Sequence, residues 1–236
     1  MIGGMPNRKS PASRPSSARR TPRPSSKILL KDQAYTKLRN LISTGVFSPN
    51  TFLSERQLVR QLGMSKTPIR SALEQLELRG MVAISPQQGI VVKERSIRET
   101  VELFDVRTAI EPFLVSRLAT RGLSTEQQAL AAKNLERQKA VANHGDFAQA
   151  AMLDLEFHML LAAFHDNREM RDWLSICFDK LHESIRRVNR LMAGRMLKSQ
   201  ADHVAIFTAI TAGRPELAAS RMTDHLKYGR QFLLDS

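Results

Sequence analysis

The sequence comprises 236 residues, of which 36 are Lys or Arg and 23 are Asp or Glu, giving a formal net charge of +13 at pH 7. This length suits one or two domains, and the lone Cys177 excludes an internal disulfide framework and is expected to be a small core residue. No apolar run reaches the length of a membrane span and no secretory signal is evident, so we expect a cytoplasmic protein with no membrane partner.

Positive charge is concentrated in the first 93 residues. Residues 1–26 hold six basic residues and no acidic one, and residues 27–93 hold ten basic and four acidic residues, whereas residues 94–236 hold twenty basic and nineteen acidic residues. Five prolines and little apolar surface prevent residues 1–26 from folding, which predicts a disordered basic arm. Its role is either an auxiliary contact to phosphates or a solubilising extension.

Residues 27–93 show the helix pattern of a winged helix-turn-helix. Ser54 is placed to cap a helix and Gln57 completes a capping box, after which apolar residues repeat at helical spacing until Gly63 ends the helix. A second helix is expected to follow at once, with Ser65 as its N-cap. The predicted apolar side of this second helix comprises Ile69, Leu73, Leu76 and Leu78.

A short hairpin is predicted to form the wing, with strands near 82–84 and 90–92 and a turn at 85–89. Two helices joined by a tight turn, the second opening with basic and hydroxyl residues, place side chains on base edges in the major groove. The alternative is a helical hairpin that only packs. The candidate DNA-contacting residues are Arg56, Ser65, Lys66, Thr67 and Arg70 on the two helices, and Gln88 and Gly89 in the wing.

These residues resemble the DNA-binding domain of the GntR family of bacterial transcription regulators. The family's leading helix corresponds to 31–44, its Leu-Ser-Glu block to 53–56, its Gly-x-Ser-Arg-Thr-Pro-x-Arg motif to 63–70, and the end of its wing to 88–89. Lys66 and Gln88 stand where the family has arginine, and lysine lacks the planar fork that grips a guanine through two hydrogen bonds. The resemblance implies a homodimer bound to a palindromic double-stranded DNA operator.

From residue 96 onward the strand signals end, and apolar residues recur every three or four positions. Six helices are predicted, over 96–121, 124–143, 146–165, 167–193, 198–212 and 215–233, with breaks that include Gly122, Gly145, Gly194 and Gly213. Short breaks join neighbouring antiparallel helices. The sequence therefore predicts a mainly α protein, with a winged helix-turn-helix in 27–93 and an antiparallel all-α helical bundle in 94–236.

One aspartate and three histidines of the predicted bundle form a candidate metal site. Asp154 and His158 are four residues apart and so project from one face of a helix, while His203 and His225 lie on two later helices. One carboxylate and three imidazoles suit Zn, Ni, Mn or a related divalent ion. The alternative is that these histidines are packed or solvated without a metal.

Three segments around these residues resemble the motifs of the FCD-type ligand-binding domain of FadR-type GntR regulators. The segments are 153–158, 202–206 and 222–226, and the resemblance implies that Asp154, His158, His203 and His225 are metal ligands. The segment 107–111 resembles another family motif, which implies that Arg107 faces an effector cavity; the alternative is a surface salt bridge from Arg107 to Glu111. The other histidines, expected to be solvated or at helix ends, are His144, His165 and His182.

Together these features predict a regulator and not an enzyme. The expected protein is a sequence-specific DNA-binding repressor, the sign being an implication of the resemblance, whose bundle binds a divalent metal and a small organic acid. Four protein ligands would leave open positions on a six-coordinate ion for a carboxylate, and Arg107 could hold a second anionic group. Two alternatives are a metal-dependent hydrolase and a metal-independent regulator that binds an acyl or lipid-like ligand.

Overall fold

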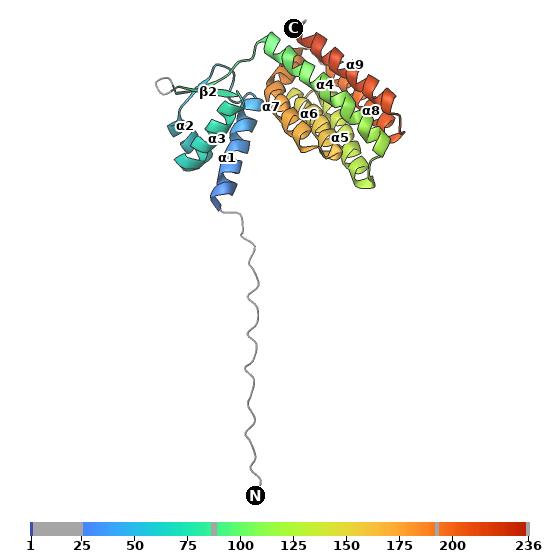
Figure 1. Cartoon of the computed structure of the whole chain (residues 1–236). Coiled ribbons are helices and arrows are strands. Elements are labelled where there is room, and N and C mark those ends of the chain that lie inside the picture. Colours follow the sequence, from blue (N-terminus) through green and yellow to red (C-terminus); the bar gives the residue numbers. More distant parts are fainter. Residues whose placement is uncertain (2–25, 86–88, 192–193, 235–236) are drawn as a thin grey trace.

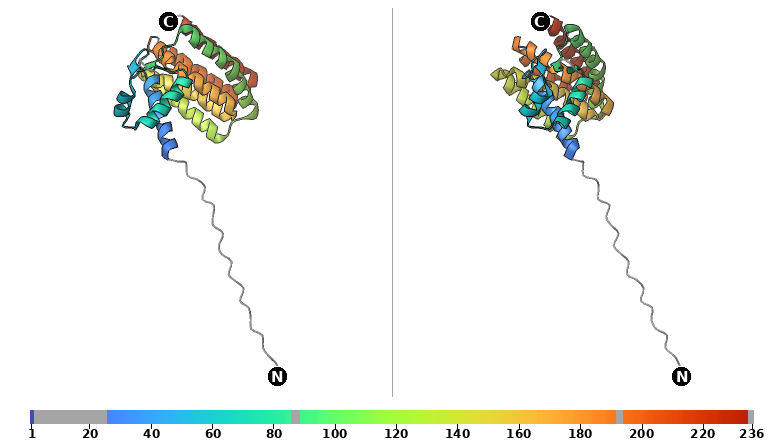
Figure 2. Two further views of the ribbon diagram at one scale, coloured as in Figure 1. Left: turned by 60° about the vertical axis from the view of Figure 1, so that its left-hand side comes forward. Right: turned by 90° about the vertical axis from the view of Figure 1, so that its left-hand side faces the viewer.

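The computed structural model describes residues 1, 26–85, 89–191 and 194–234. Residues 2–25 of the predicted arm and the wing residue Gln88 lie outside the described residues. The chain forms a small N-terminal body and a larger helical bundle, each with its own hydrophobic core. The small body lies at one end of the bundle, where α1 is next to α7 (Figures 1 and 2).

The small body has the predicted winged helix-turn-helix order. Its elements are α1 (Ser26–Ser43), β1 (Phe52–Leu53), α2 (Glu55–Leu62), α3 (Lys66–Leu78), β2 (Val82–Ser85) and β3 (Gly89–Val92). The three strands form an antiparallel sheet in the order β1-β3-β2, in which Ile90 of β3 is opposite Leu53 and Ile84. The leading helix starts at Ser26, earlier than predicted, and β1 adds a strand that the sequence pattern does not indicate.

Local chemistry explains the turn between α2 and α3. The hydroxyl of Ser54 accepts a hydrogen bond from the backbone N–H of Gln57 at 3.2 Å, which satisfies one donor at the start of α2. Gly63 ends α2 with φ 63°, a left-handed conformation that costs glycine little because it has no Cβ. Ser65 lies at the N-cap of α3, but its hydroxyl makes no capping hydrogen bond.

The predicted apolar side of α3 is right except for Leu78. Ile69, Leu73 and Leu76 are buried in the core of the small body, whereas Leu78 is 88 % exposed. Nine residues separate Leu78 from Ile69, which is two and a half helical turns, so the two side chains project from opposite faces. The mainly α fold class itself is confirmed.

The bundle contains the six helices that the sequence predicts. They are α4 (Ile97–Arg121), α5 (Thr125–His144), α6 (Phe147–His165), α7 (Arg168–Leu191), α8 (Gly194–Thr211) and α9 (Pro215–Leu234). Capping boxes start α4 at Ser96 and α5 at Ser124. The predicted start of α8 at residue 198 is wrong, because the helix begins at Gly194 and adds a turn that carries Arg195.

Helix α6 occupies the interior of the bundle and packs against α4, α5, α7 and α8. The sequence is expected to contain no apolar run long enough to span a membrane. Among the described residues, however, one helix, α6, is long and apolar enough to do so. Half of that stretch is buried inside the bundle, and it carries Asp154 and His158, so its composition is that of a core helix. Cys177 of α7 is buried in the same core, as predicted.

Candidate metal centre and DNA-binding surface

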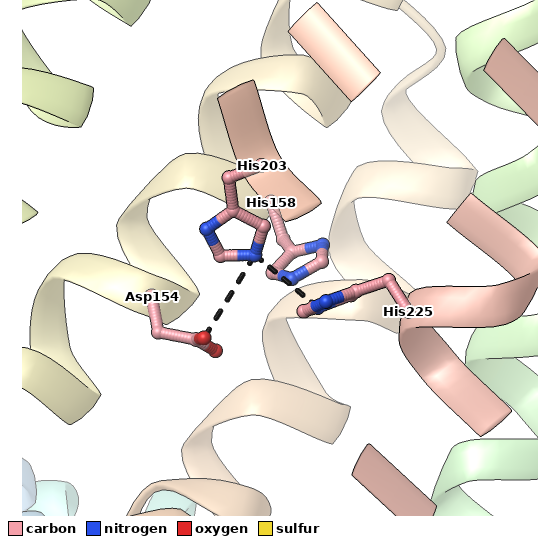
Figure 3. Close-up of side chains that lie close together, drawn as sticks. All are labelled: Asp154, His158, His203 and His225. Carbon is pink, nitrogen blue, oxygen red and sulfur yellow. Dashed lines mark hydrogen bonds and ion pairs between the residues drawn. The ribbon is translucent and has the colours of Figure 1, made fainter. Parts of the chain in front are cut away.

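Four polar side chains from three helices meet inside the bundle (Figure 3). Asp154 and His158 lie one turn apart on α6, His203 lies on α8, and His225 lies on α9. One ligand atom from each residue lies within 4.8 Å of the others. All four residues are buried, and His203 is 0 % exposed. The structure thus brings together every residue that the sequence analysis names as a metal ligand.

The spacing of these atoms suits a single divalent cation. The Nε2 atoms of His203 and His225 are 3.2 Å apart, and His203 Nε2 is 3.8 Å from Asp154 Oδ1. Metal–nitrogen bonds of about 2.1 Å put neighbouring ligands about 3.0 Å apart in an octahedral site and about 3.4 Å apart in a tetrahedral one. The donor set therefore needs only small movements to close around an ion.

Hydrogen bonds orient two of the imidazole rings from behind. His203 Nδ1 lies 2.8 Å from Gln138 Oε1, and His158 Nδ1 contacts Glu111 Oε2. Because both partners are oxygen acceptors, each ring is expected to carry its proton on Nδ1 and direct the lone pair of Nε2 into the cluster. His158 Nε2 is buried and has no hydrogen-bond partner among the described residues. An orphaned imidazole nitrogen of this kind fits a cation.

The remaining two candidate ligands also have outer partners. His225 Nδ1 lies 3.6 Å from Asp202 Oδ2. The hydroxyl of Ser199 donates a hydrogen bond of 2.6 Å to Asp154 Oδ1, which leaves the carboxylate further lone pairs. A carboxylate behind His158 and an amide behind His203 form the arrangement that fixes the ring orientation in metal sites, whereas the His225 Nδ1 and Asp202 Oδ2 atoms make no hydrogen bond among the described residues.

The protonation states favoured by this interior are those that a metal requires. Burial lowers the pKa of His203 well below its usual value and also lowers the pKa of His225, so both rings are neutral near pH 7. Burial raises the pKa of Asp154, but electrostatic coupling of its carboxylate to the protonated form of each neighbouring histidine, and to Arg195, outweighs burial and the net shift is downward. His203 and His225 therefore offer neutral imidazoles to the cluster, and Asp154 offers an ionised carboxylate.

Arg107 of α4 lies beside the cluster and is buried. Its Nε donates a hydrogen bond of 2.6 Å to Glu111 Oε1, and its guanidinium carbon is 5.0 Å from the ring centre of Phe178. The pairing with Glu111 is as the sequence suggested, but the surface location is wrong, since Arg107 is 1 % exposed. Burial raises the pKa of Glu111, yet Arg107 and His158 lower it to about 2. Arg107 Nη2 has no hydrogen-bond partner in the described part of the chain.

A second buried arginine, Arg195, enters the same region from α8. Its Nη1 donates a hydrogen bond of 2.7 Å to Asn189 Oδ1, while its Nε is buried without a hydrogen-bond partner among the residues described. Burial lowers the pKa of Arg195, the charge of Asp154 raises it, and the charge of Arg107 lowers it. Two guanidinium groups thus lie near one site, each with an unused donor.

Several of these residues are not predicted from the sequence. Arg195, Ser199 and His203 follow each other at intervals of four, so helical spacing could have placed all three on one face of α8. Gln138 lies on α5, far from the other residues in sequence, and no local signal marks it. Its role depends on how α5 packs against α8.

The three other histidines differ from one another. His144 and His165 are the last residues of α5 and α6, as expected for helix-terminal groups. The expectation that His182 is solvated or at a helix end is wrong, because this side chain is buried and its Nδ1 lies 2.6 Å from the carbonyl oxygen of Ser43. Ser43 ends α1, so His182 links α7 to the small body.

The predicted DNA-contacting residues lie on the outside of the small body. Arg56, Ser65, Lys66, Thr67 and Arg70 are exposed, and Gly89 is half-buried. Glu55 of α2 lies 3.1 Å from Lys66 Nζ and 3.9 Å from Arg70 Nε. Exposed ion pairs of this kind contribute about 0–1 kcal/mol, so a phosphate or base can replace Glu55 at little cost.

Gly89 has a structural reason to be glycine. Its φ is 85°, and a Cβ at this position would lie 3.1 Å from the backbone oxygen of Leu53. A side chain at the start of β3 would therefore strain the backbone and push β1 away by a few tenths of an ångström. This contact sets the base of the wing.

Comparisons with known proteins agree with this architecture. Residues 30–92 match the family model described as bacterial regulatory proteins, gntR family, and residues 102–228 match the FCD domain. The second match covers more than half of the chain.

Similar proteins extend the match over both parts of the chain. The uncharacterized HTH-type transcriptional regulator YdhC of Bacillus subtilis is 25 % identical over 201 residues, which are 85 % of this chain and 89 % of YdhC. The HTH-type transcriptional repressor RspR of Escherichia coli is 28 % identical over 204 residues, covering 84 % and 86 %. The solved structure of E. coli McbR/YncC superposes with a TM-score of 0.79 at 20 % identity, covering 87 % of this chain and 97 % of that one.

Proposed function

Since this chain belongs to the GntR family of bacterial regulatory proteins and carries an FCD domain, we propose that it is a cytoplasmic repressor controlled by a small organic acid effector. Binding of this effector would depend on a metal ion in the same domain. Its relatives are HTH-type transcriptional regulators, which supports transcription regulation through DNA binding and not an enzymatic role. The effector domain would bind a divalent ion together with a small carboxylate. Effector binding would then weaken the hold on the operator.

The observation that carries the metal proposal is the buried set of three imidazoles and one carboxylate. Asp154 Oδ1 and the Nε2 atoms of His158, His203 and His225 would hold the ion. Without a cation, the Nε2 atoms of His203 and His225 share a single proton across 3.2 Å, and His158 Nε2 stays without a hydrogen-bond partner among the described residues. This donor set suits Zn, Ni or Mn, and a bound ion would supply open coordination positions for the effector's oxygen atoms.

The charges around the site indicate a dianionic effector. Arg107 and Arg195 are buried cations, and Glu111 and Asp154 are buried anions, so these four cancel. A divalent ion would then leave two uncompensated positive charges in a buried space, which is costly. A small dicarboxylate would neutralise them, with one carboxylate at the ion and the other at the unused donors of Arg107 and Arg195.

The DNA-binding surface proposed here is the exposed start of α3 together with the wing. Ser65, Lys66, Thr67 and Arg70 would enter the major groove, and Arg56 of α2 would contact the backbone or a base edge. Because such modules bind half-sites, a homodimer would recognise a palindromic operator. The effector would act by changing how the two small bodies are held.

The hydrolase and acyl-binding alternatives gain no support from this site. A hydrolase needs a free general base beside the metal, but Glu111 is already engaged by Arg107 and His158. An acyl-binding cavity is apolar, whereas this interior contains two arginines with unused donors.

Calorimetric titration tests the proposal. Zinc added to chelator-stripped protein should bind at one site per chain, and His203→Ala should abolish that binding. Malate should then bind the zinc-loaded protein more tightly than the monoanion lactate. Arg195→Gln should retain zinc but bind malate about 10- to 100-fold more weakly, since a charge-assisted hydrogen bond contributes about 1.5–3 kcal/mol.

The exposed Arg190→Gln on α7 provides the matched control and should bind malate as the wild type does. Tight zinc binding by His203→Ala would overturn the metal site. Equal affinities for malate and lactate would overturn the dianionic effector while leaving the metal site intact.

A further inference from the structure

Helix α7 contacts the candidate metal centre and the DNA-binding body through adjacent residues. Phe178 lies on the side of the effector site, where its ring centre is 5.9 Å from that of His158 and 5.0 Å from the guanidinium carbon of Arg107. The next residue, Asp179, contacts the small body, as does His182 one turn later. A single turn of helix therefore connects the two parts of the molecule.

Asp179 gathers three partners from the small body around one carboxylate. Its Oδ2 accepts hydrogen bonds from the Tyr35 hydroxyl at 3.1 Å and from Arg79 Nη1 at 2.9 Å, and its Oδ1 is 3.5 Å from Arg39 Nη1. The Asp179 side chain is 9 % exposed, so these interactions are only weakly screened by solvent. Tyr35 and Arg39 belong to α1, and Arg79 directly follows α3, the predicted recognition helix.

The partners of Asp179 also support one another. The guanidinium carbon of Arg79 lies 5.4 Å from the ring centre of Tyr35, within the range of a cation–π contact. Burial and the Asp179 charge raise the pKa of Tyr35 to about 12, so its hydroxyl stays a donor at physiological pH. The second contact of α7 is the hydrogen bond between His182 and the carbonyl oxygen of Ser43.

The interface between α7 and the small body is not fully closed. A groove of about 350 Å³ runs beside the same contacts, lined by Arg39, Ser43, Met159, Phe178 and His182 among others. Because this groove interrupts the packing between the two bodies, polar contacts contribute to holding their relative orientation. The Asp179 carboxylate, with three partners on the small body, is therefore well placed to define the relative orientation of the two bodies.

We propose that Asp179 is a positioning residue, which fixes the orientation of the DNA-binding body relative to the bundle and transmits the state of the effector site to α3. The positioning role stands on the contacts of Asp179 alone. The transmission rests on the proposed function, because an anion that draws Arg107 toward itself would change the packing of Phe178. Phe178 and Asp179 are consecutive on a rigid helix, so a shift of one moves the other.

The test measures the distance between the two bodies directly. Fluorescent donor and acceptor dyes are attached to Gln61→Cys on α2 and Ser220→Cys on α9, both exposed positions, while the native Cys177 is buried. Labelled chains are mixed with excess unlabelled protein, so that energy transfer reports distances within one chain. Single-molecule efficiencies are recorded without additions, with zinc alone, and with zinc plus malate.

We expect the wild type to give one narrow distance distribution that shifts with zinc and malate. Asp179→Asn, which preserves shape but removes the charge, should broaden the distribution and lose the shift. Asp172→Asn is the matched control on the same helix, because Asp172 is exposed and forms ion pairs with the local Arg168 and Arg171. This control should behave as the wild type.

A second pair of variants changes Arg79, the partner of Asp179 on the small body. Arg79→Gln should reproduce the broadening, and Arg79→Lys, which keeps the charge, should largely restore the narrow distribution. A narrow distribution in both Asp179→Asn and Arg79→Gln would overturn the positioning role. A distribution that broadens in these variants, with a wild type that binds zinc and malate but does not shift, would overturn the transmission. Failure of zinc to bind would refute the proposed function but leave the distance comparison as a test of Asp179.

Discussion

Removal of one histidine ligand should abolish the increase in melting temperature that zinc gives this protein. The candidate ligands lie between residues 154 and 225 of the sequence, on α6, α8 and α9, so a bound ion would join three helices. An ion that binds only the folded chain stabilises it by about 2.7 kcal/mol when its free concentration is 100 times the dissociation constant. For a chain of this size, 1 kcal/mol raises the melting temperature by about 2–4 °C. Zinc should therefore raise the melting temperature of the stripped wild type by about 5–11 °C.

Differential scanning calorimetry of chelator-stripped protein, with and without zinc, measures this increment. His225→Ala should lose nearly all of it, and Asp154→Asn, which keeps the side-chain shape and a hydrogen-bonding partner for Ser199, should lose much of it. His144→Ala is the control, because His144 is exposed at the end of α5. An undiminished zinc increment in both His225→Ala and Asp154→Asn would refute the assignment of the four ligands.

Three further predictions concern the small body. Arg70→Ala should weaken binding to a duplex selected by the wild-type protein by about 1–3 kcal/mol if the side chain contacts a base, measured by fluorescence anisotropy; an unchanged isotherm would remove it from the interface. Gly89→Ala should lower the free energy of unfolding in urea by at least about 1 kcal/mol, because its left-handed φ and the nearby oxygen of Leu53 disfavour a Cβ, and wild-type stability would contradict this. Tyr35 has a raised folded-state pKa of about 12, so its stabilising contribution is present below pH 10 and lost as the pH rises toward 12. Tyr35→Phe should accordingly lose less stability than the wild type over that range, and parallel losses would show that this hydroxyl is not protected by Asp179.

Local sequence determined most of the secondary structure and part of the candidate site. Ser54 and Gly63 set the start and the end of α2. Both act through contacts within a few residues, so a local sequence pattern can reveal these helix ends. The same holds for Asp154 and His158, whose four-residue spacing puts them on one face of α6 whatever surrounds the helix. The position of Leu78 could also have been derived, since helical geometry alone separates it from Ile69.

Tertiary structure decided which polar groups are buried and what they meet. Gln138 reaches His203 only because α5 packs against α8, and Arg107 becomes a buried charge because α7 covers it. Asp179 has no sequence signal that distinguishes it from Asp172 on the same helix, yet one is enclosed by the small body and the other faces solvent. The physical reason is that spacing along a helix fixes the direction of a side chain, whereas its electrostatic partners and its desolvation depend on segments far away in the chain.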